Sequence, residues 1–174
     1  MLSNKMFIFT VMKTSIATTA LAIFAFASST ATFAQGVTVD HYTSGKYECA
    51  LFPDTYPTDI GGKPFTPTHD QADAAVKTLE ASLKNVKCDK KDDRDEIVKN
   101  LMKYKIQVFG YTDKEGNKML LLNCFRNDDN KDKDLAANWL TDMIQVENGG
   151  FYFWTIRFDV GKNGLFDFKT NGNG

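Results

Sequence analysis

Residues 151–170 read FYFWTIRFDVGKNGLFDFKT and carry the strongest strand pattern of the chain. Within Phe151–Val160, large apolar side chains occupy every second position, which is typical of a β-strand that buries one face. These side chains are Tyr152, Trp154, Ile156, Phe158 and Val160. Gly161–Gly164 supplies a turn, and Leu165–Thr170 returns as the last strand. The sequence therefore predicts an antiparallel hairpin in this stretch.

Two further strands are predicted upstream, at Tyr104–Phe109 and Lys118–Phe125. A loop between them contains Gly116, which can adopt the positive φ that hairpin loops often need. Segment Trp139–Val146 is another strand candidate, although residues 135–140 also fit a helical turn. Four consecutive strands joined by short turns predict an antiparallel meander.

An amphipathic helix is predicted before these strands. Pro67 suits a first-turn position, Thr66 or Thr68 can cap the helix, and Thr68 with Gln71 has the spacing of a capping box. Apolar residues then recur every three or four positions, and the opposite side is charged. The apolar stripe consists of Ala72, Ala75, Val76, Leu79, Leu83 and Val86. This pattern indicates a helix that covers one face of the sheet.

The segment 35–66 holds three of the four prolines and is predicted to be an extended N-terminal arm, in which Lys46–Phe52 could pair as a strand. A domain of residues 67–174 follows it. We therefore predict an α+β fold, in which one long amphipathic helix packs on a four-stranded antiparallel meander and an extended arm precedes the helix.

Residues 1–34 have the organisation of a secretory signal peptide. Lys5 and Lys13 are their only charged residues, an apolar run covers Ala20–Ala27, and small residues end at Ala34. The apolar run is shorter than the about 20 residues that span a bilayer. We therefore expect a soluble periplasmic or extracellular protein, with no membrane insertion after signal removal. The sequence leaves open whether the chain starts at Met1 or Met12.

The net charge of the chain limits the kinds of partner that it can bind. Cleavage after Ala34 removes two lysines and changes the net formal charge from −1 to −3. Such a chain has no basic excess with which to hold nucleic acid, so no nucleic-acid partner is predicted.

Cys49, Cys88 and Cys124 are an odd number of thiols, and the sequence does not choose among the three possible disulfide pairings.

Several short motifs carry a family resemblance. They are Phe65–Thr68, Val108–Tyr111, Asn123–Phe125, Asn148–Trp154 and Phe166–Gly172. Together they resemble an uncharacterised family of small exported Bacteroidota proteins, over roughly residues 64–172. A helix followed by a meander is also similar to cystatin-like and PepSY-type α+β units. The resemblance implies no catalytic residue, and the Gln-x-Val-x-Gly loop of a cystatin-type inhibitor is missing from this sequence.

Catalytic and metal-binding patterns are weak. His41 and His69 are the only histidines, and no G-x-S-x-G nucleophile motif occurs. The loop Asp128–Asp134 alternates oxygen ligands that can wrap calcium, but Lys133 stands where such a loop needs glycine. We therefore predict a protein that is not an enzyme and has no catalytic residues, cofactor or metal; whether the acidic loop binds calcium stays open.

Aromatic side chains are the remaining candidates for function, because large aromatics dominate protein interfaces. We predict that Phe151, Phe153, Trp139 and Arg157 contact a partner, and that the exposed edge strand Leu165–Thr170 also does so. The predicted function is a non-enzymatic exported binding module, an accessory subunit of an envelope or extracellular protein complex. Its partner would be another envelope or extracellular protein.

Two alternatives to that function stay open. One is a small-ligand or glycan-binding protein that uses Trp139, Trp154 and neighbouring phenylalanines. The other is a secreted protease inhibitor of cystatin-like shape.

Overall fold

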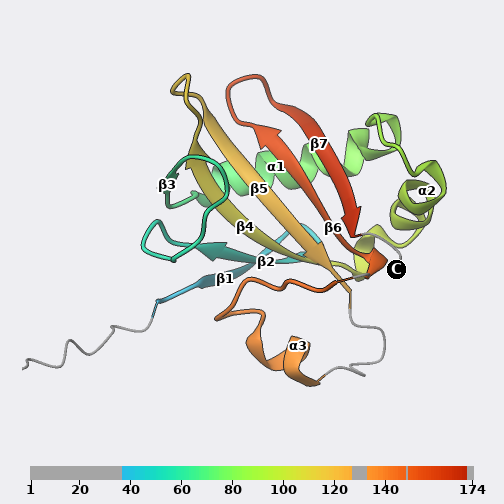
Figure 1. The fold of residues 1–174 in the computed structure, drawn as a ribbon, viewed down its shortest axis with the longest axis horizontal. Coiled ribbons are helices and arrows are strands. Elements are labelled where there is room, and N and C mark those ends of the chain that lie inside the picture. Colours follow the sequence, from blue (N-terminus) through green and yellow to red (C-terminus); the bar gives the residue numbers. More distant parts are fainter. Residues whose placement is uncertain (1–36, 127–132, 148, 172–174) are drawn as a thin grey trace, which may run out of the picture. The chain divides into compact units, whose positions relative to one another are not determined.

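The computed structural model describes residues 37–126, 133–147 and 149–171 (Figure 1). The predicted signal peptide at 1–34 lies outside them. The strands are β1 (Asp40–Ser44), β2 (Tyr47–Phe52), β3 (Lys63–Phe65), β4 (Lys105–Thr112), β5 (Lys118–Phe125), β6 (Gly150–Asp159) and β7 (Gly164–Asn171). The helices are α1 (His69–Ser82), α2 (Lys91–Lys99) and α3 (Lys133–Asn138), with single 3-10 turns η1 (Leu83–Asn85) and η2 (Leu101–Lys103).

The predicted fold of one long helix on a four-stranded meander is wrong, because the described residues form a seven-stranded mixed sheet. Its strand order is β1-β2-β4-β5-β6-β7, and β3 pairs with β4 beyond the end of β2. The β2–β4 pair is parallel and the other pairs are antiparallel. The longest helical stretch, α1 with η1, spans 17 residues. The molecule is therefore an α+β protein dominated by its sheet.

The segment 35–66, predicted as an extended arm, contributes three strands to this sheet. Gly45 has a φ of 60° and closes the tight β1–β2 hairpin. β2 then lies beside β4, with Cys49 opposite Ile106 and Phe52 opposite Phe109. A parallel pair requires a long crossover connection, which β3, α1 and α2 supply. Local periodicity does not reveal a pairing between segments so far apart in the sequence.

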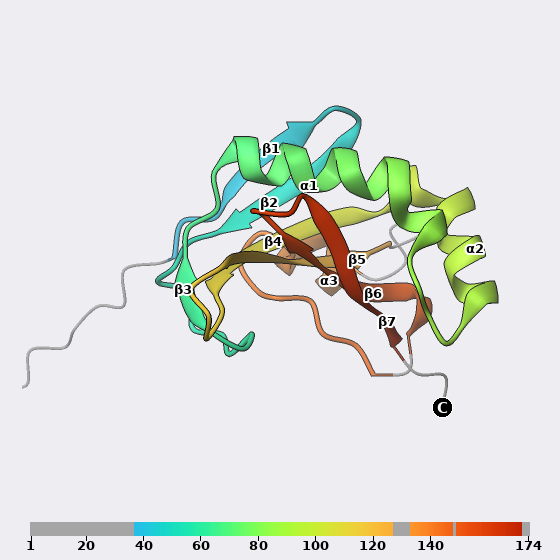
Figure 2. The same ribbon diagram turned by 90° about the horizontal axis from the view of Figure 1, so that it is seen from above.

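The predicted start of α1 is confirmed by its capping box. The Gln71 backbone N–H donates to the Thr68 hydroxyl at 3.3 Å, and the Gln71 side-chain oxygen accepts from the Thr68 N–H at 3.1 Å. These bonds satisfy two donors that would otherwise be unpaired at the end of the helix. The apolar stripe of α1 packs on one face of the sheet (Figure 2).

The second face of the sheet is covered by the loop 53–62 and by the segment 133–147. Trp139–Val146 is therefore not a strand, and the alternative of a helical turn at residues 135–140 overlaps α3. The segment continues from α3 in an irregular conformation across the sheet (Figure 2). Gln107 and Asn123 are neighbours on β4 and β5, and both are buried. The amide of Gln107 donates to the carbonyls of Trp139 at 2.7 Å and Asp142 at 2.8 Å.

These two amides also bind each other and the backbone of Ile144 in the same segment. Asn123 donates to the Gln107 side-chain oxygen at 2.9 Å and to the Ile144 carbonyl at 2.8 Å, and the Ile144 N–H donates to Gln107 at 2.9 Å. We call Gln107 and Asn123 the amide clamp. It provides hydrogen-bond partners for a backbone that has no strand neighbour and would be costly to bury unpaired.

Candidate functional site

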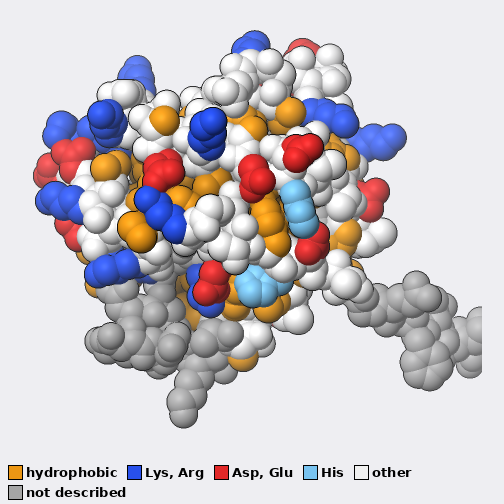
Figure 3. Space-filling view, turned by 180° about the vertical axis from the view of Figure 1, so that it is seen from behind, with side chains coloured by type: hydrophobic (Ala, Val, Ile, Leu, Met, Phe, Trp, Pro, Cys, Tyr) orange, Lys and Arg blue, Asp and Glu red, His pale blue; other side chains and the backbone are white. Residues whose placement is uncertain are grey.

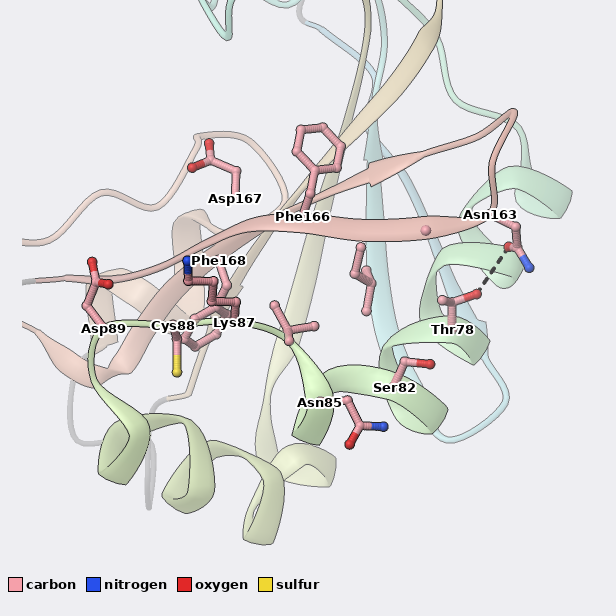
Figure 4. A pocket seen from close by; sticks show the side chains of 13 residues that line it. Thr78, Ser82, Asn85, Lys87, Cys88, Asp89, Asn163, Phe166, Asp167 and Phe168 are labelled. Carbon is pink, nitrogen blue, oxygen red and sulfur yellow. Dashed lines mark hydrogen bonds between the residues drawn. The ribbon is translucent and has the colours of Figure 1, made fainter.

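A groove runs along β7, which forms one edge of the sheet (Figure 4). Its volume is about 670 Å³, and its opposite wall is made by α1, η1 and the loop 86–89. A smaller hollow of about 140 Å³ continues it as far as Thr170 and shares Cys88, Asp89 and Phe168 with it. The two hollows adjoin along the strand, and together we call them the β7 groove.

The two ends of the β7 groove are tied to the helices. At one end, the Thr78 hydroxyl of α1 donates to the Asn163 side chain at 3.1 Å. At the other end, the Thr170 hydroxyl donates to Asp93 of α2 at 3.2 Å. Both ends of the groove therefore contact helices that pack on the sheet.

β7 contains a bulge that directs its aromatic side chains to opposite sides. Thr155 pairs with Lys169 and Arg157 pairs with Phe166, so β7 has one more residue than β6 over this stretch. Asp167 is the bulged residue, and its backbone φ is 50°. Phe168 consequently extends toward Cys88, whereas Phe166 points away from α1 and is 38% exposed (Figure 4).

Asp167 is held ionised by its neighbours. Burial alone raises the pKa of this carboxyl, but hydrogen bonds from Lys169 and Arg157 outweigh burial, and the pKa lies below its ordinary value. Besides Asp167, the charged residues of the β7 groove are Lys87, Asp89, Lys90 and Lys169. The groove therefore mixes charges of both signs with apolar surface, which suits a polypeptide segment better than a strongly charged small ligand.

The three cysteines lie in different environments. Cys49 and Cys124 are buried on either side of Ile106, two strands apart in one sheet face, and Cys88 is half-buried in the β7 groove. Burial raises the pKa of Cys49 to about 12 and that of Cys124 well above its ordinary value. Neighbouring strands are about 4.8 Å apart. Cys49 and Cys124 are separated by two such spacings, which exceed the Cα–Cα distance that a disulfide can span.

Thiol labelling should separate these environments. In the native protein a disulfide-exchange reagent such as Ellman's reagent should modify Cys88 rapidly, because its thiol borders an open groove. Cys49 and Cys124 should react only on unfolding, because both are buried and protonated. The measurement is the number of thiols that react before and after addition of denaturant, with Cys88→Ser as the control. Rapid native labelling of the Cys88→Ser variant would contradict the assignment.

The histidines contact residues of the sheet and of the segment that crosses it. His69 Nε2 lies 2.7 Å from an Asp40 carboxylate oxygen, and its ring stacks on Tyr42 with centroids 4.1 Å apart. His41 meets the edge of the Trp139 ring. Figure 3 shows histidine side chains next to acidic side chains on the side of the molecule opposite to the view of Figure 1. Cys49 lies opposite Tyr42 across the β1–β2 pair, but its thiol is buried and protonated and makes a poor nucleophile.

The residues predicted to contact a partner do not lie on one surface. Trp139 is 4% exposed and, with Phe153, packs on the second face of the sheet. Phe151 packs against the core on the α1 face and stacks on Tyr152. Arg157 donates to the Ile60 carbonyl at 3.0 Å, to the Tyr111 hydroxyl and to Asp167 at 3.0 Å. Their proposed role in binding stays a prediction.

Sequence reasoning missed the wall of the β7 groove that faces the strand. Ser82 and Asn85 lie between the last residues of the apolar stripe, residues 87–89 follow it, and all of them look like an ordinary polar helix end. No local signal places them beside β7. The edge strand itself was predicted, at Leu165–Thr170, and the structure places it at the sheet edge as Gly164–Asn171.

Comparison of the chain with protein families, with curated proteins and with solved structures found no match. The resemblance to small exported Bacteroidota proteins therefore stays a prediction. Within the described residues, no group of three or more histidine, cysteine or acidic side chains is placed to hold a metal ion. Residues 127–132 of the acidic loop lie outside that part of the chain. None of the helices in the described ranges combines the length and apolar character needed to cross a bilayer.

Proposed function

We propose that this chain is a non-enzymatic exported binding module that serves as an accessory subunit of an envelope or extracellular protein complex. It binds an extended segment of its partner along β7. The observation that supports this proposal is the open edge of β7: the strand pairs with β6 on one side and with no described strand on the other. An added strand would gain main-chain hydrogen bonds there, and the β7 groove would take its side chains.

The bulge at Asp167 limits what can bind to this edge. It divides β7 into Gly164–Phe166 and Phe168–Asn171, so a regular strand from another molecule cannot pair along the whole length. Bulges and charges on edge strands are common protection against unwanted sheet extension. A partner segment that bends with β7 can contact both parts of the strand. Because only segments able to adopt this bend would do so, the bulge makes binding selective.

Export rests on the signal peptide predicted at residues 1–34. A glycan-binding function is less well supported, because Trp139 and Trp154, the two rings expected to stack on sugars, are both buried. The indole of Trp154 is part of the core beneath α1.

Photo-crosslinking tests the proposal. A benzoylphenylalanine at position 166 in the full chain should form one dominant adduct with an envelope or extracellular protein, because Phe166 is exposed beside the edge. The same analogue at Tyr152 is a matched control, since that side chain is 37% exposed and lies on β6. Equal capture at both positions would argue against docking at β7.

A synthetic peptide of the captured segment then locates the contact. Its addition should slow amide hydrogen exchange within residues 164–171 and leave β1, at the opposite edge, unchanged. Protection at β1 instead of β7, or at neither, would contradict strand addition at β7.

A further inference from the structure

The end of α2 and the turn η2 form a separate surface that is apolar at its tip. Met102 is 64% exposed, more than any other large apolar side chain of the described residues. Val98, four residues earlier, is 36% exposed. Single exposed apolar residues are ordinary, but Val98 of α2 and Met102 of η2 line the same hollow and together form a small apolar tip.

Lysines surround this tip. Lys46, Lys84, Lys99 and Lys103 line a hollow of about 410 Å³ together with Met102. The acid in its lining, Glu80, is bonded to Lys46, whose ammonium holds the Glu80 pKa below its ordinary value. Lys84 and Lys103 form no ion pair with any described residue, so the hollow keeps a positive excess. The chain as a whole has a net formal charge of −1, so this excess is local. We call this surface the lysine–Met102 tip.

The two acids in the first turn of α2 lie away from the tip, whereas Glu96, closer to it, lies 3.8 Å from Lys99 and offsets the charge of that lysine. Asp92 and Asp93 stand in its first turn and Lys99 at its end. A helix rises about 1.5 Å per residue, so Asp92 and Lys99 are separated by about 10 Å along the axis. That distance is about one Debye length at physiological salt. A surface that touches the tip therefore meets the lysines and is largely screened from these aspartates.

We propose that the lysine–Met102 tip docks the protein on the surface of anionic phospholipid bilayers. A membrane is favoured over an acidic protein because a highly exposed apolar side chain, Met102, lies among the lysines, a combination that is typical of interfacial anchors. The lysines would reach anionic headgroups while their methylene stems and Met102 lie against the apolar boundary. This is peripheral binding at the interface, and it is independent of strand addition at β7.

Vesicle partitioning of the full chain tests this proposal. Vesicles that contain phosphatidylglycerol in phosphatidylcholine are compared with vesicles of phosphatidylcholine alone. A basic side chain near an anionic surface contributes about fivefold to the partition coefficient. Lys84→Gln/Lys103→Gln should therefore lower partitioning to the anionic vesicles roughly 30-fold. Met102→Ser should lower it by about tenfold, through lost apolar burial. Added salt should weaken binding of the wild type.

The control variant is Lys63→Gln/Lys114→Gln, which removes the same charge from exposed sites at the other end of β4. Any contribution of residues 1–34 to vesicle binding is common to all variants. Equal losses in the control and in Lys84→Gln/Lys103→Gln would overturn the proposal, as would a wild type with no preference for anionic vesicles. Loss of binding with the lysine variant alone, and none with Met102→Ser, would identify a site for soluble anions or acidic proteins and would also overturn it.

Discussion

Replacement of Gln107 by leucine is expected to lower the free energy of unfolding by about 4 kcal/mol. Leucine has a similar volume but leaves four groups without their partner: the carbonyls of Trp139 and Asp142, the Ile144 N–H and the Asn123 amide. Each buried polar group without a partner costs about 1–3 kcal/mol. Asp142 is exposed, so water can replace the Gln107 donor at its carbonyl. The expected loss of stability therefore lies near the lower end of the range that four such groups would give.

Unfolding in urea provides the measurement, because the free energy is obtained from the midpoint and slope of the transition. Gln145→Leu is the matched control: it makes the same chemical change in the segment 133–147, but at an exposed side chain. The control should stay within about 0.5 kcal/mol of the wild type. A loss below about 1 kcal/mol for Gln107→Leu would show that the amide clamp contributes little.

The same substitution should change local opening as well as global stability. The clamp is what binds the backbone of the segment 139–144 to the sheet, so Gln107→Leu should speed amide exchange at Ile144 more than at Ile106. Ile106 lies next to Gln107 on β4 but belongs to the α1 face of the core. Uniform acceleration at both amides would indicate a global effect alone.

The local structure of the chain could be predicted wherever one element carries its own signal. The cap at Thr68, the apolar stripe of α1 and the strands near β4–β7 all follow from periodicity and end signals within a few residues. β2 and β4 could not be paired in this way, because parallel partners separated by a helix share no local pattern. The neighbouring β3–β4 pair does leave a clue: at Gly110 of β4, a Cβ would lie 2.5 Å from the carbonyl oxygen of Phe65 in β3. Such a strand glycine indicates close approach of another backbone.

The second face of the sheet was misread for a different reason. Trp139–Val146 is apolar enough to be a strand, and its polar partners, Gln107 and Asn123, lie on other elements. A polar side chain at an inward position of a strand is a signal that something binds it, and two such residues on neighbouring strands predict a shared partner. Only part of the candidate site could be predicted. The edge strand β7 has its own sequence pattern, whereas the opposite wall of the β7 groove depends on how α1 crosses the sheet.

Replacement of Arg157 by leucine is expected to lower the free energy of unfolding by about 2–3 kcal/mol. Its guanidinium joins β6 to the loop 53–62 through Ile60, to β4 through Tyr111 and to β7 through Asp167, and its side chain is 24% exposed. Leucine keeps the apolar stem but leaves the Ile60 carbonyl without this donor. Arg157→Lys should recover only part of the lost stability. The lysine ammonium can bind one of these partners, but it cannot bind several in different directions as the planar guanidinium does.

Lys169→Leu is the control for this experiment, because Lys169 binds the same carboxylate but its side chain is 66% exposed. Exposed ion pairs contribute about 0–1 kcal/mol, so the control should change stability little. Urea unfolding and capture by the benzoylphenylalanine at position 166 should be measured on the same variants. If Arg157 is instead a partner contact, as its sequence position suggested, Arg157→Leu would abolish capture while leaving the free energy of unfolding unchanged. A loss of stability would assign Arg157 to the fold, because the groups it binds belong to three segments that no other described side chain joins in this way.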